Sequence, residues 1–337
     1  MSKRVVTFGE IMLRLAPEGY NRFLQAQSFG AVYGGGEANV AVSLAQLGLD
    51  AAYITKLPAH ELGQAAVNTL RAVGVDTGGI IRGGDRIGIY FFERGASQRP
   101  SKVIYDRANS AFALSKAEEY DWERIFEEAD WFHLTGITPA LSEELARVSI
   151  EAVKTAKRLG LTVSCDINYR AKLWDKATAG RVMSEILSNT DIYIGGRGQA
   201  EDLFGIRAEL KSEDDYDAYK PVAEELVRRF GLKKVSITLR TTVSSDRNKW
   251  AALLYDGKNH FISREYDISI VDRVGGGDSF AAGLIYALEE GMNTRSAVEF
   301  AAAASCLKLT VEGDANFVTA DEVKALAFGS GSAQVQR

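Results

Sequence analysis

Residues 270–291 read IVDRVGGGDSFAAGLIYALEEG, and this segment carries more chemical information than any other part of the chain. Gly275, Gly276 and Gly277 stand directly before Asp278, and an apolar helical pattern follows them. Three successive glycines let backbone amides converge without obstruction by side chains. A helix N-terminus adds unpaired N–H donors and the positive end of a dipole. We therefore predict an anion-binding cradle suited to phosphate, with the Asp278 carboxylate at its mouth.

A carboxylate in that position can accept a proton from a substrate hydroxyl, which is the arrangement that phosphoryl transfer requires. The alternative is a glycine-rich turn that begins a helix, with Asp278 as a favourable acidic residue in the first turn. Two other nucleotide-binding motifs are excluded. No lysine follows these glycines as in a P-loop, and the first strand ends in FGEIM (8–12) in place of GxGxxG.

On both sides of this segment, short apolar runs alternate with amphipathic helical patterns. The predicted strands are 4–8, 51–57, 131–134, 161–167, 191–194, 234–239, 250–255 and 259–263. The predicted helices are 34–48, 62–73, 139–160, 176–187, 222–230 and those after Gly276 and Asn293. We expect the polar stretch TTVSSDRNK (241–249) to form a loop. This alternation predicts a mainly parallel sheet with helices on both faces and ligands at the carboxyl ends of its strands.

The alternation is interrupted between about residues 80 and 109. RIGIYFFERG (86–95) and SKVIYDR (101–107) are β-rich runs joined by turn-forming residues, which is typical of a hairpin. We predict a small β-lid formed mainly by about 14–33 and 86–109. Residues 1–328 are expected to form a single α/β domain, and 329–337 a disordered tail.

Composition narrows the class of protein. Of 337 residues, 46% are hydrophobic, and 40 Lys and Arg against 45 Asp and Glu leave a formal net charge of −5. This balance argues against a nucleic-acid-binding surface. No apolar run approaches the ~20 residues of a membrane span, and the N-terminus does not resemble a signal peptide. Two cysteines and three scattered histidines suggest neither a disulfide framework nor a His-based metal site. We expect a cytoplasmic protein with no nucleic-acid or membrane partner.

VDRVGGGDSFAAG (271–283) resembles the C-terminal signature of the ribokinase-like (PfkB) carbohydrate kinases. The N-terminal signature of that family, two glycines followed by an Asn-x-Ala helix start, is matched by Gly34, Gly35, Asn39 and Ala41. The resemblance extends to about residue 328. It implies a ribokinase-like three-layer α/β sandwich and phosphoryl transfer from ATP, with Mg²⁺, to a sugar hydroxyl.

The resemblance also implies roles for single residues. Asp278 would be the general base and would contact the sugar, and the amides of Gly275, Gly276 and Gly277 would form the anion hole. Gly34, Gly35 and Asn39 would line the sugar site. The residues implied at the nucleotide are Arg240, Asn316 and, in the cradle, Gly275 and Gly277. A solvated arginine at a strand end is the alternative role of Arg240.

Two further segments are similar to those of 2-keto-3-deoxygluconate kinases: GIYFFERGASQRPSKVIYDRANSA (88–111) and DINYRAKLW (166–174). A sugar acid carries a carboxylate, which a guanidinium group can hold bidentately. Arg107 and Arg170 are therefore candidates for the acid or keto end of the substrate. Tyr90 and Tyr105 would donate hydroxyl hydrogen bonds or cover the sugar. The alternatives are a packed hairpin face for Tyr90 and a purely structural role for Arg170.

Together these features predict ATP-dependent phosphorylation of 2-keto-3-deoxygluconate at its 6-position. The alternatives are 2-keto-3-deoxygalactonate or fructose as substrate, or a catalytically weakened sugar-acid binder. The weakened binder is an alternative because many family members carry Asn-x-x-Glu, thought to organise Mg²⁺, where this chain has GGRGQAEDLFG (195–205). No metal ligand is assigned. Unpaired lid edges predict a homo-oligomer that pairs through the lid.

Overall fold

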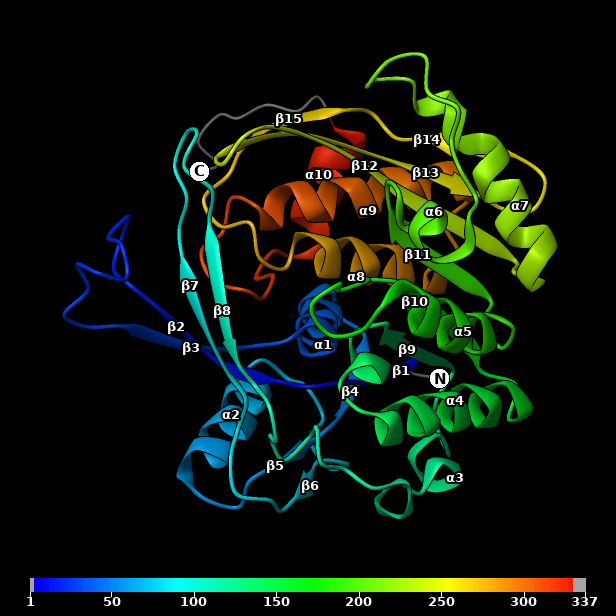
Figure 1. Ribbon diagram of the computed structural model, residues 1–337. Helices are drawn as coiled ribbons and strands as arrows, with labels where there is room; N and C mark the ends of the chain where they lie inside the picture. The colour runs from blue at the N-terminus through cyan, green and yellow to red at the C-terminus, as the bar shows by residue number, and fades with distance from the viewer. Residues whose placement is uncertain (1–2, 330–337) are drawn as a thin grey trace.

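The computed structural model describes residues 3–329, and within them the main sheet has nine strands (Figure 1). Its order is β14-β13-β12-β11-β10-β9-β1-β4, with β15 paired to β13. The parallel strands are β4 (Asp50–Ile54), β1 (Arg4–Phe8), β9 (Trp131–Thr135), β10 (Thr162–Asp166), β11 (Ile192–Gly196) and β12 (Lys234–Ser244). The antiparallel strands are β13 (Arg247–Tyr255), β14 (His260–Ile262) and β15 (Tyr266–Ser269).

Helices cover both faces of this sheet. One apolar core lies under α1 (Gly36–Leu47), α2 (Glu61–Ala72), α8 (Gly276–Glu289), α9 (Thr294–Lys308) and α10 (Ala320–Phe328). The other lies under α3 (Trp122–Ile125), α4 (Glu143–Arg158), α5 (Lys176–Leu187), α6 (Gln199–Phe204) and α7 (Lys220–Phe230). The predicted three-layer sandwich with a mainly parallel sheet is confirmed.

Helix α4 illustrates how the sequence produces these elements. Leu145, Val148 and Ala152 recur at helical spacing and are fully buried against the sheet. The hydroxyl of Ser142 accepts a hydrogen bond from the Leu145 N–H and so caps the first turn. The pattern that predicted this helix is therefore the pattern that buries it.

A second sheet of four strands stands beside the carboxyl ends of the main sheet and projects at the left of Figure 1. Its order is β3 (Gly30–Gly34), β2 (Met12–Ala16), β7 (Ile89–Glu93) and β8 (Lys102–Asp106). These strands come from the segments for which a lid is predicted, with β2 beginning at Met12. Short β5 (Lys56–Leu57) and β6 (Ile81–Arg82) pair separately.

The predicted loop at 241–249 is wrong. Strands β12 and β13 continue through it as a long hairpin, in which Thr242 pairs with Asn248. Its polar composition hid the strands because the backbone hydrogen bonds between β12 and β13, and between β13 and β15, do not require apolar side chains. Strand β15 and helix α10 were not predicted.

Within residues 3–329, no helix has both the length and the apolar character that crossing a bilayer requires. Of the predicted disordered tail, residues 330–337 lie outside the described residues.

Candidate active site

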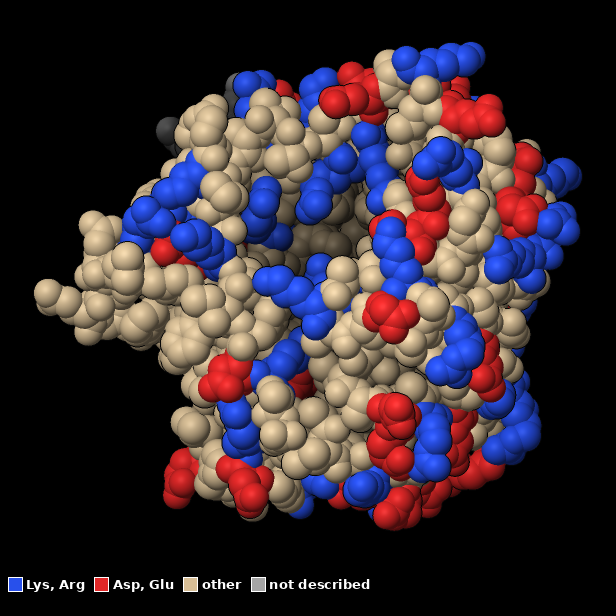
Figure 2. Space-filling view, viewed as in Figure 1, with Lys and Arg blue, Asp and Glu red and all other residues tan. Residues whose placement is uncertain are grey.

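A cavity of about 570 Å³ lies between the carboxyl ends of the parallel strands, the N-terminus of α8 and the four-stranded sheet. Its volume falls within the range of small-molecule sites. Figure 2 shows Lys and Arg side chains gathered around a hollow on this face. The predicted site residues that line it are Gly35, Asn39, Tyr90, Tyr105, Arg107, Arg170, Arg240, Gly275, Gly276, Gly277 and Asp278.

The glycine cradle forms the start of α8. Gly275, the residue before the helix, has φ 81°, and a β-carbon there would collide with the carbonyl oxygen of Asp314. Both constraints require glycine. The first hydrogen bond of the helix runs from the Ser279 N–H to the Gly275 carbonyl at 2.8 Å. The preceding N–H groups are those that helix geometry leaves free for an anion at the cavity wall.

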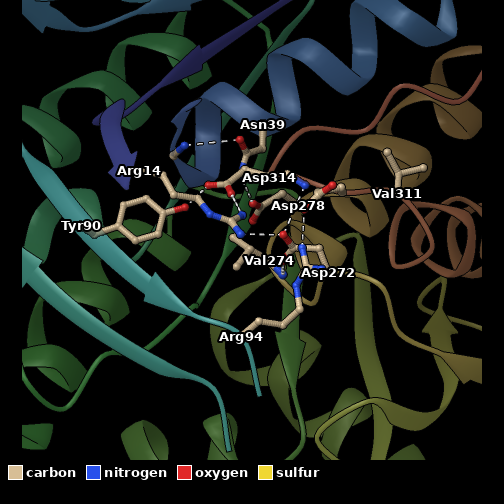
Figure 3. A network of polar contacts seen from close by, with 12 residues as sticks. Arg14, Asn39, Tyr90, Arg94, Asp272, Val274, Asp278, Val311 and Asp314 are labelled. Carbon is tan, nitrogen blue, oxygen red and sulfur yellow. Dashed lines mark hydrogen bonds and ion pairs between the residues drawn. The ribbon is translucent and has the colours of Figure 1, made fainter. Parts of the chain in front are cut away.

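The Asp278 carboxylate is held by one side chain. Asn39 Nδ2 donates to Asp278 Oδ2 at 2.7 Å, while Asn39 Oδ1 accepts the Gly35 N–H at 3.3 Å (Figure 3). Asp278 Oδ1 accepts no hydrogen bond from the described residues, so it is available to a ligand. Burial, followed by the negative charge of Asp314, raises the pKa of Asp278 to about 6, against the opposing effect of Asn39. At neutral pH the group is an ionised carboxylate of increased basicity.

Four arginines line the cavity without an ion-pair partner among residues 3–329: Arg170, Arg197, Arg240 and Arg273. In Arg197 and Arg273, buried Nε and Nη2 atoms also lack hydrogen-bond partners within that range. Partial removal from water, together with the charges of Arg273 and Arg170, lowers the pKa of Arg240. Guanidinium groups crowded in this way favour a bound polyanion, and phosphate oxygens match their donor geometry.

Arg197 and Arg273 were missed by the sequence reasoning. Arg273 stands immediately before the cradle, and Arg197 lies within the glycine-rich GGRGQ segment. Both positions carried a usable signal, because an arginine beside an anion-binding backbone is placed to contact the same anion.

The four-stranded sheet supplies Tyr90, Tyr105 and Arg107 to the opposite wall. Arg107 pairs with Glu10 through Nε (2.8 Å) and Nη2, so Nη1 is left for a ligand. The Tyr90 hydroxyl donates to Asp314, and Tyr90 is only 4% exposed. Tyr105 is 47% exposed, and its ring centroid lies 6.0 Å from that of Tyr90. The two tyrosines therefore form one aromatic surface, of which Tyr105 is the accessible part.

Two predicted site residues are not brought to the cavity. Gly34 packs against the side chain of Asp314, with no room for a β-carbon. Asn316 is buried, donates to Ser279 Oγ at 2.9 Å and accepts the Val318 N–H at 3.2 Å. Its polar atoms are satisfied within the chain. Asn316 therefore supports the first turn of α8 through Ser279 and does not line the cavity.

The glycine-rich segment 195–205, where many family members carry Asn-x-x-Glu, begins with a local turn. The Gly196 N–H donates to Gln199 Oε1 at 2.9 Å, and Arg197 faces the cavity beside it. The described part of the chain contains no group of three or more His, Cys, Asp or Glu placed to hold a metal ion.

Asp166, at the end of β10, lines the cavity near Asp278. Burial and the Asp278 charge raise its pKa to about 7.

Comparisons with known proteins agree with this geometry. The family profile described as "pfkB family carbohydrate kinase" matches residues 2–321. A 2-dehydro-3-deoxygalactonokinase from Haloferax volcanii is 34% identical over 339 residues, which cover 100% of both chains. A 2-dehydro-3-deoxygluconokinase from Bacillus subtilis is 30% identical over 318 residues, covering 93% of this chain and 92% of that protein.

A solved structure shows the same similarity in three dimensions. The crystal structure of a 2-dehydro-3-deoxygluconokinase from Thermotoga maritima superposes with a TM-score of 0.94 at 50% sequence identity. The match covers 96% of this chain and 99% of that one. The ribokinase-like expectation for the fold is thereby confirmed.

Proposed function

Since the chain belongs to the pfkB family of carbohydrate kinases, we propose that it transfers the γ-phosphoryl group of ATP to the 6-hydroxyl of 2-keto-3-deoxygluconate, also named 2-dehydro-3-deoxygluconate. One observation carries the proposal: the Asp278 carboxylate stands at the mouth of the glycine cradle, in a cavity that also contains four arginines with no ion-pair partner among residues 3–329. The 50% identity to the Thermotoga maritima enzyme supports the choice of substrate.

In the proposed mechanism Asp278 Oδ1 takes the proton of the sugar hydroxyl while Asn39 holds Oδ2. The cradle amides receive the transferring phosphoryl group, and Arg197, Arg240 and Arg273 hold the phosphate chain. Mg²⁺ bound together with ATP would neutralise phosphate charge, and an ion that keeps several waters would need few protein ligands. Asp166, which lines the cavity, would be the carboxylate to hold those waters.

A sugar acid accounts for two further cations that line the cavity, Arg107 and Arg170. Arg107 has a free Nη1, and Arg170 has no ion-pair partner among the described residues. Glu10 already balances the charge of Arg107, so a neutral hexose would leave Arg170 as the uncompensated cation, whereas a substrate carboxylate would pair with Arg170 and accept a hydrogen bond from Arg107 Nη1.

The 4-epimer, 2-keto-3-deoxygalactonate, is the second candidate substrate. It is favoured by the Haloferax volcanii relative, which is named for that sugar acid and matches the whole chain at 34% identity. A catalytically weakened binder is the third candidate, raised by the GGRGQ segment. The free Asp278 Oδ1 beside an anion cradle supports turnover over mere binding.

The decisive assay measures ATP consumption by the purified protein with four sugars in parallel: 2-keto-3-deoxygluconate, its 4-epimer, fructose and ribose, each with Mg²⁺. We expect kcat/KM to be highest for the gluconate form. Preference for the galactonate form would replace the first candidate by the second, and turnover of fructose alone would reject a sugar-acid substrate. Sugar-acid binding without any turnover would favour the weakened binder.

The raised pKa of Asp278 predicts the acid limb of the pH profile. Only the ionised carboxylate accepts a proton, so kcat/KM should rise with pH through about 6 and level off above it. Below that value the rate should fall about tenfold per pH unit, because the ionised fraction falls by that factor. Steady-state rates between pH 4.5 and 8.5 measure this, and a flat profile across that range would contradict Asp278 as the base.

We propose a homodimer formed by the four-stranded sheet. Its outer strands β3 and β8 expose apolar side chains, including Ile104 at 54% and Val32 at 42%. Exposed edges with apolar side chains favour pairing with a second copy. Ile104→Asp should shift sedimentation at micromolar concentration from dimer to monomer, whereas Leu210→Asp, at an exposed position on a remote loop, should not. A monomeric unchanged protein would refute the proposal.

A further inference from the structure

A buried arginine joins the four-stranded sheet to the two walls of the cavity. Arg14 is the central residue of β2 and is 3% exposed. Its Nη2 donates to Asp272 Oδ2 at 2.6 Å and its Nη1 donates to Asp314 Oδ1 at 2.5 Å (Figure 3). The ring centroid of Phe92, on the neighbouring β7, lies 4.3 Å from the guanidinium carbon. An arginine is almost never buried to this degree unless it is paired, and Arg14 is paired twice.

Asp272 connects Arg14 to the start of the cradle. Its Oδ1 accepts the Val274 N–H at 3.1 Å, and its Oδ2 accepts the Gly313 N–H at 3.2 Å. Val274 directly precedes Gly275, the residue before α8. The orientation of the Asp272 carboxylate therefore sets the backbone that enters the cradle, and Arg14 holds this carboxylate from the side of the sheet.

Asp314 connects the same arginine to the cavity wall that carries Tyr90. Asp314 lines the cavity, and its Oδ2 accepts the hydroxyl of Tyr90. Its side chain fills the place that a β-carbon of Gly34 would occupy, and its carbonyl oxygen fills that place at Gly275. A displacement of Asp314 would therefore reach both the turn before α1 and the cradle.

Arg14 supplies the positive charge that these two carboxylates share. Within residues 3–329 it is the only ion-pair partner of Asp272 and of Asp314. Burial lowers the pKa of Arg14, but the charges of Asp314 and Asp272 outweigh burial and raise it, so the guanidinium keeps its charge. Its buried Nε has no hydrogen-bond partner within that range. The two terminal nitrogens, one for each carboxylate, therefore make the whole connection.

A further ion pair between the sheet and the loop after α9 lies at the surface. Arg94, directly after β7, donates from Nη2 to Glu312 Oε1 at 2.6 Å, and the Glu312 side chain is 74% exposed. An exposed pair contributes little free energy, whereas loss of one partner of a buried pair leaves an uncompensated charge out of water. We therefore expect Arg14, and not Arg94, to determine how the sheet is held against the cradle.

We propose that Arg14 is a positioning residue that links the sugar-binding sheet to the glycine cradle, so that binding of the sugar acid and binding of ATP strengthen each other. The inference rests on the proposed function for what the two walls of the cavity bind. A purely stabilising arginine would lower the unfolding temperature and leave the ligand affinities of the folded protein unchanged.

The physical reason is a shared cost of ordering. A sugar that contacts Tyr105 and Arg107 restricts the movement of the sheet, and through Arg14 the same restriction reaches Asp272 and the cradle. The first ligand then bears the entropic cost of ordering both walls, and the second ligand binds more tightly. By linkage, each ligand changes the affinity of the other by the same factor.

The test is calorimetric titration of the purified protein with a non-hydrolysable ATP analogue and Mg²⁺, with and without saturating 2-keto-3-deoxygluconate. In the unchanged protein we expect the sugar acid to lower the Kd of the analogue about tenfold, which is within the usual range of coupling between two sites. In Arg14→Met the sugar-free Kd should rise about fivefold, because Asp272 loses its partner, and the gain with sugar should disappear.

Arg14→Lys keeps the positive charge and covers the case in which Arg14→Met does not fold. One ammonium group does not reproduce two separately directed guanidinium nitrogens. This variant should therefore be more stable than Arg14→Met and still lose most of the coupling. Circular dichroism and unfolding temperature establish that each variant is folded.

Two arginines outside the cavity serve as matched controls. Arg4 of β1 also bridges two carboxylates, those of Asp50 at 3.0 Å and of Asp76, but it does not line the cavity. Arg94→Met breaks the exposed pair with Glu312. Arg4→Met should lower the unfolding temperature, and neither Arg4→Met nor Arg94→Met should change the Kd of the analogue or its response to sugar.

A folded Arg14→Met or Arg14→Lys whose analogue affinity and coupling both stay within about twofold of the unchanged protein would overturn the proposal. So would an unchanged protein in which a bound sugar leaves the Kd of the analogue unaltered.

The same titrations distinguish this failure from failure of the proposed function. Each of the four sugars of the activity assay is used in turn as the second ligand, so a different substrate changes only the sugar that produces the coupling. If none of them binds, the proposed function fails, and the sugar-free affinity of Arg14→Met for the analogue still decides whether Arg14 positions the cradle.

Discussion

An Asp278→Asn variant should lose about 10³-fold in kcat while it binds ATP and the sugar acid nearly as tightly as the unchanged protein. The amide keeps the size of the carboxylate and can still meet Asn39, but it cannot accept the proton of the sugar hydroxyl. Loss of the base removes an interaction that matters only in the transition state, so kcat should fall and KM should not. Coupled-assay kinetics and calorimetric binding of each ligand measure the two effects.

Asp267→Asn is the control for this substitution. Asp267 pairs with Arg247 on the exposed β13–β15 edge, away from the cavity, so the same chemical change there should leave kcat unaltered. Activity of Asp278→Asn within tenfold of the unchanged protein would reject the assignment of the base. Loss of ligand binding together with activity would instead indicate that Asp278 holds the cavity in shape.

A Gly277→Ala variant should fold at least as stably as the unchanged protein and yet lose about 100-fold in kcat. Gly277 is the second residue of α8, and a β-carbon there meets no protein atom within 4 Å. Alanine also favours a helix over glycine. The added methyl group would therefore be harmless to the fold, but it would stand at the mouth of the cradle where the phosphoryl group has to approach. Unfolding temperature and kcat, measured on the same preparation, separate the two properties.

Gly275→Ala should behave differently, because it meets both a left-handed backbone and the carbonyl oxygen of Asp314. Its unfolding temperature and its activity should fall together. The contrast between the two alanine variants tests the shape of the cradle itself. If Gly277→Ala kept both its stability and its full kcat, phosphoryl transfer would not pass through this cradle.

The features that the sequence predicted and the structure contains are those whose signal is local. Three glycines before an acidic residue and an apolar helix predict the cradle, because the left-handed turn at Gly275 and the free amides of α8 depend on neighbouring residues alone. Helix α5 was predicted with its observed bounds, since its apolar spacing lies within it and the capping Asp175 directly precedes it. Strand β15 was missed because it pairs with β13, about 20 residues earlier, and the hairpin through 241–249 was missed because its polar residues lack the apolar alternation of a strand.

By itself, then, the sequence determined most of the alternating strands and helices and placed three glycines and Asp278 at the start of α8. Tertiary structure alone decided which side chains meet there. Asn39 reaches Asp278 across 239 positions. Arg170 after β10, Arg197 after β11 and Arg240 within β12 line one cavity because those strands are neighbours in the sheet. It also directed the Tyr90 hydroxyl to Asp314 and the Lys308 ammonium to three carbonyls. Local spacing sets backbone conformation, but the pairing of buried charges depends on which elements the fold packs together, and that is a property of the whole chain.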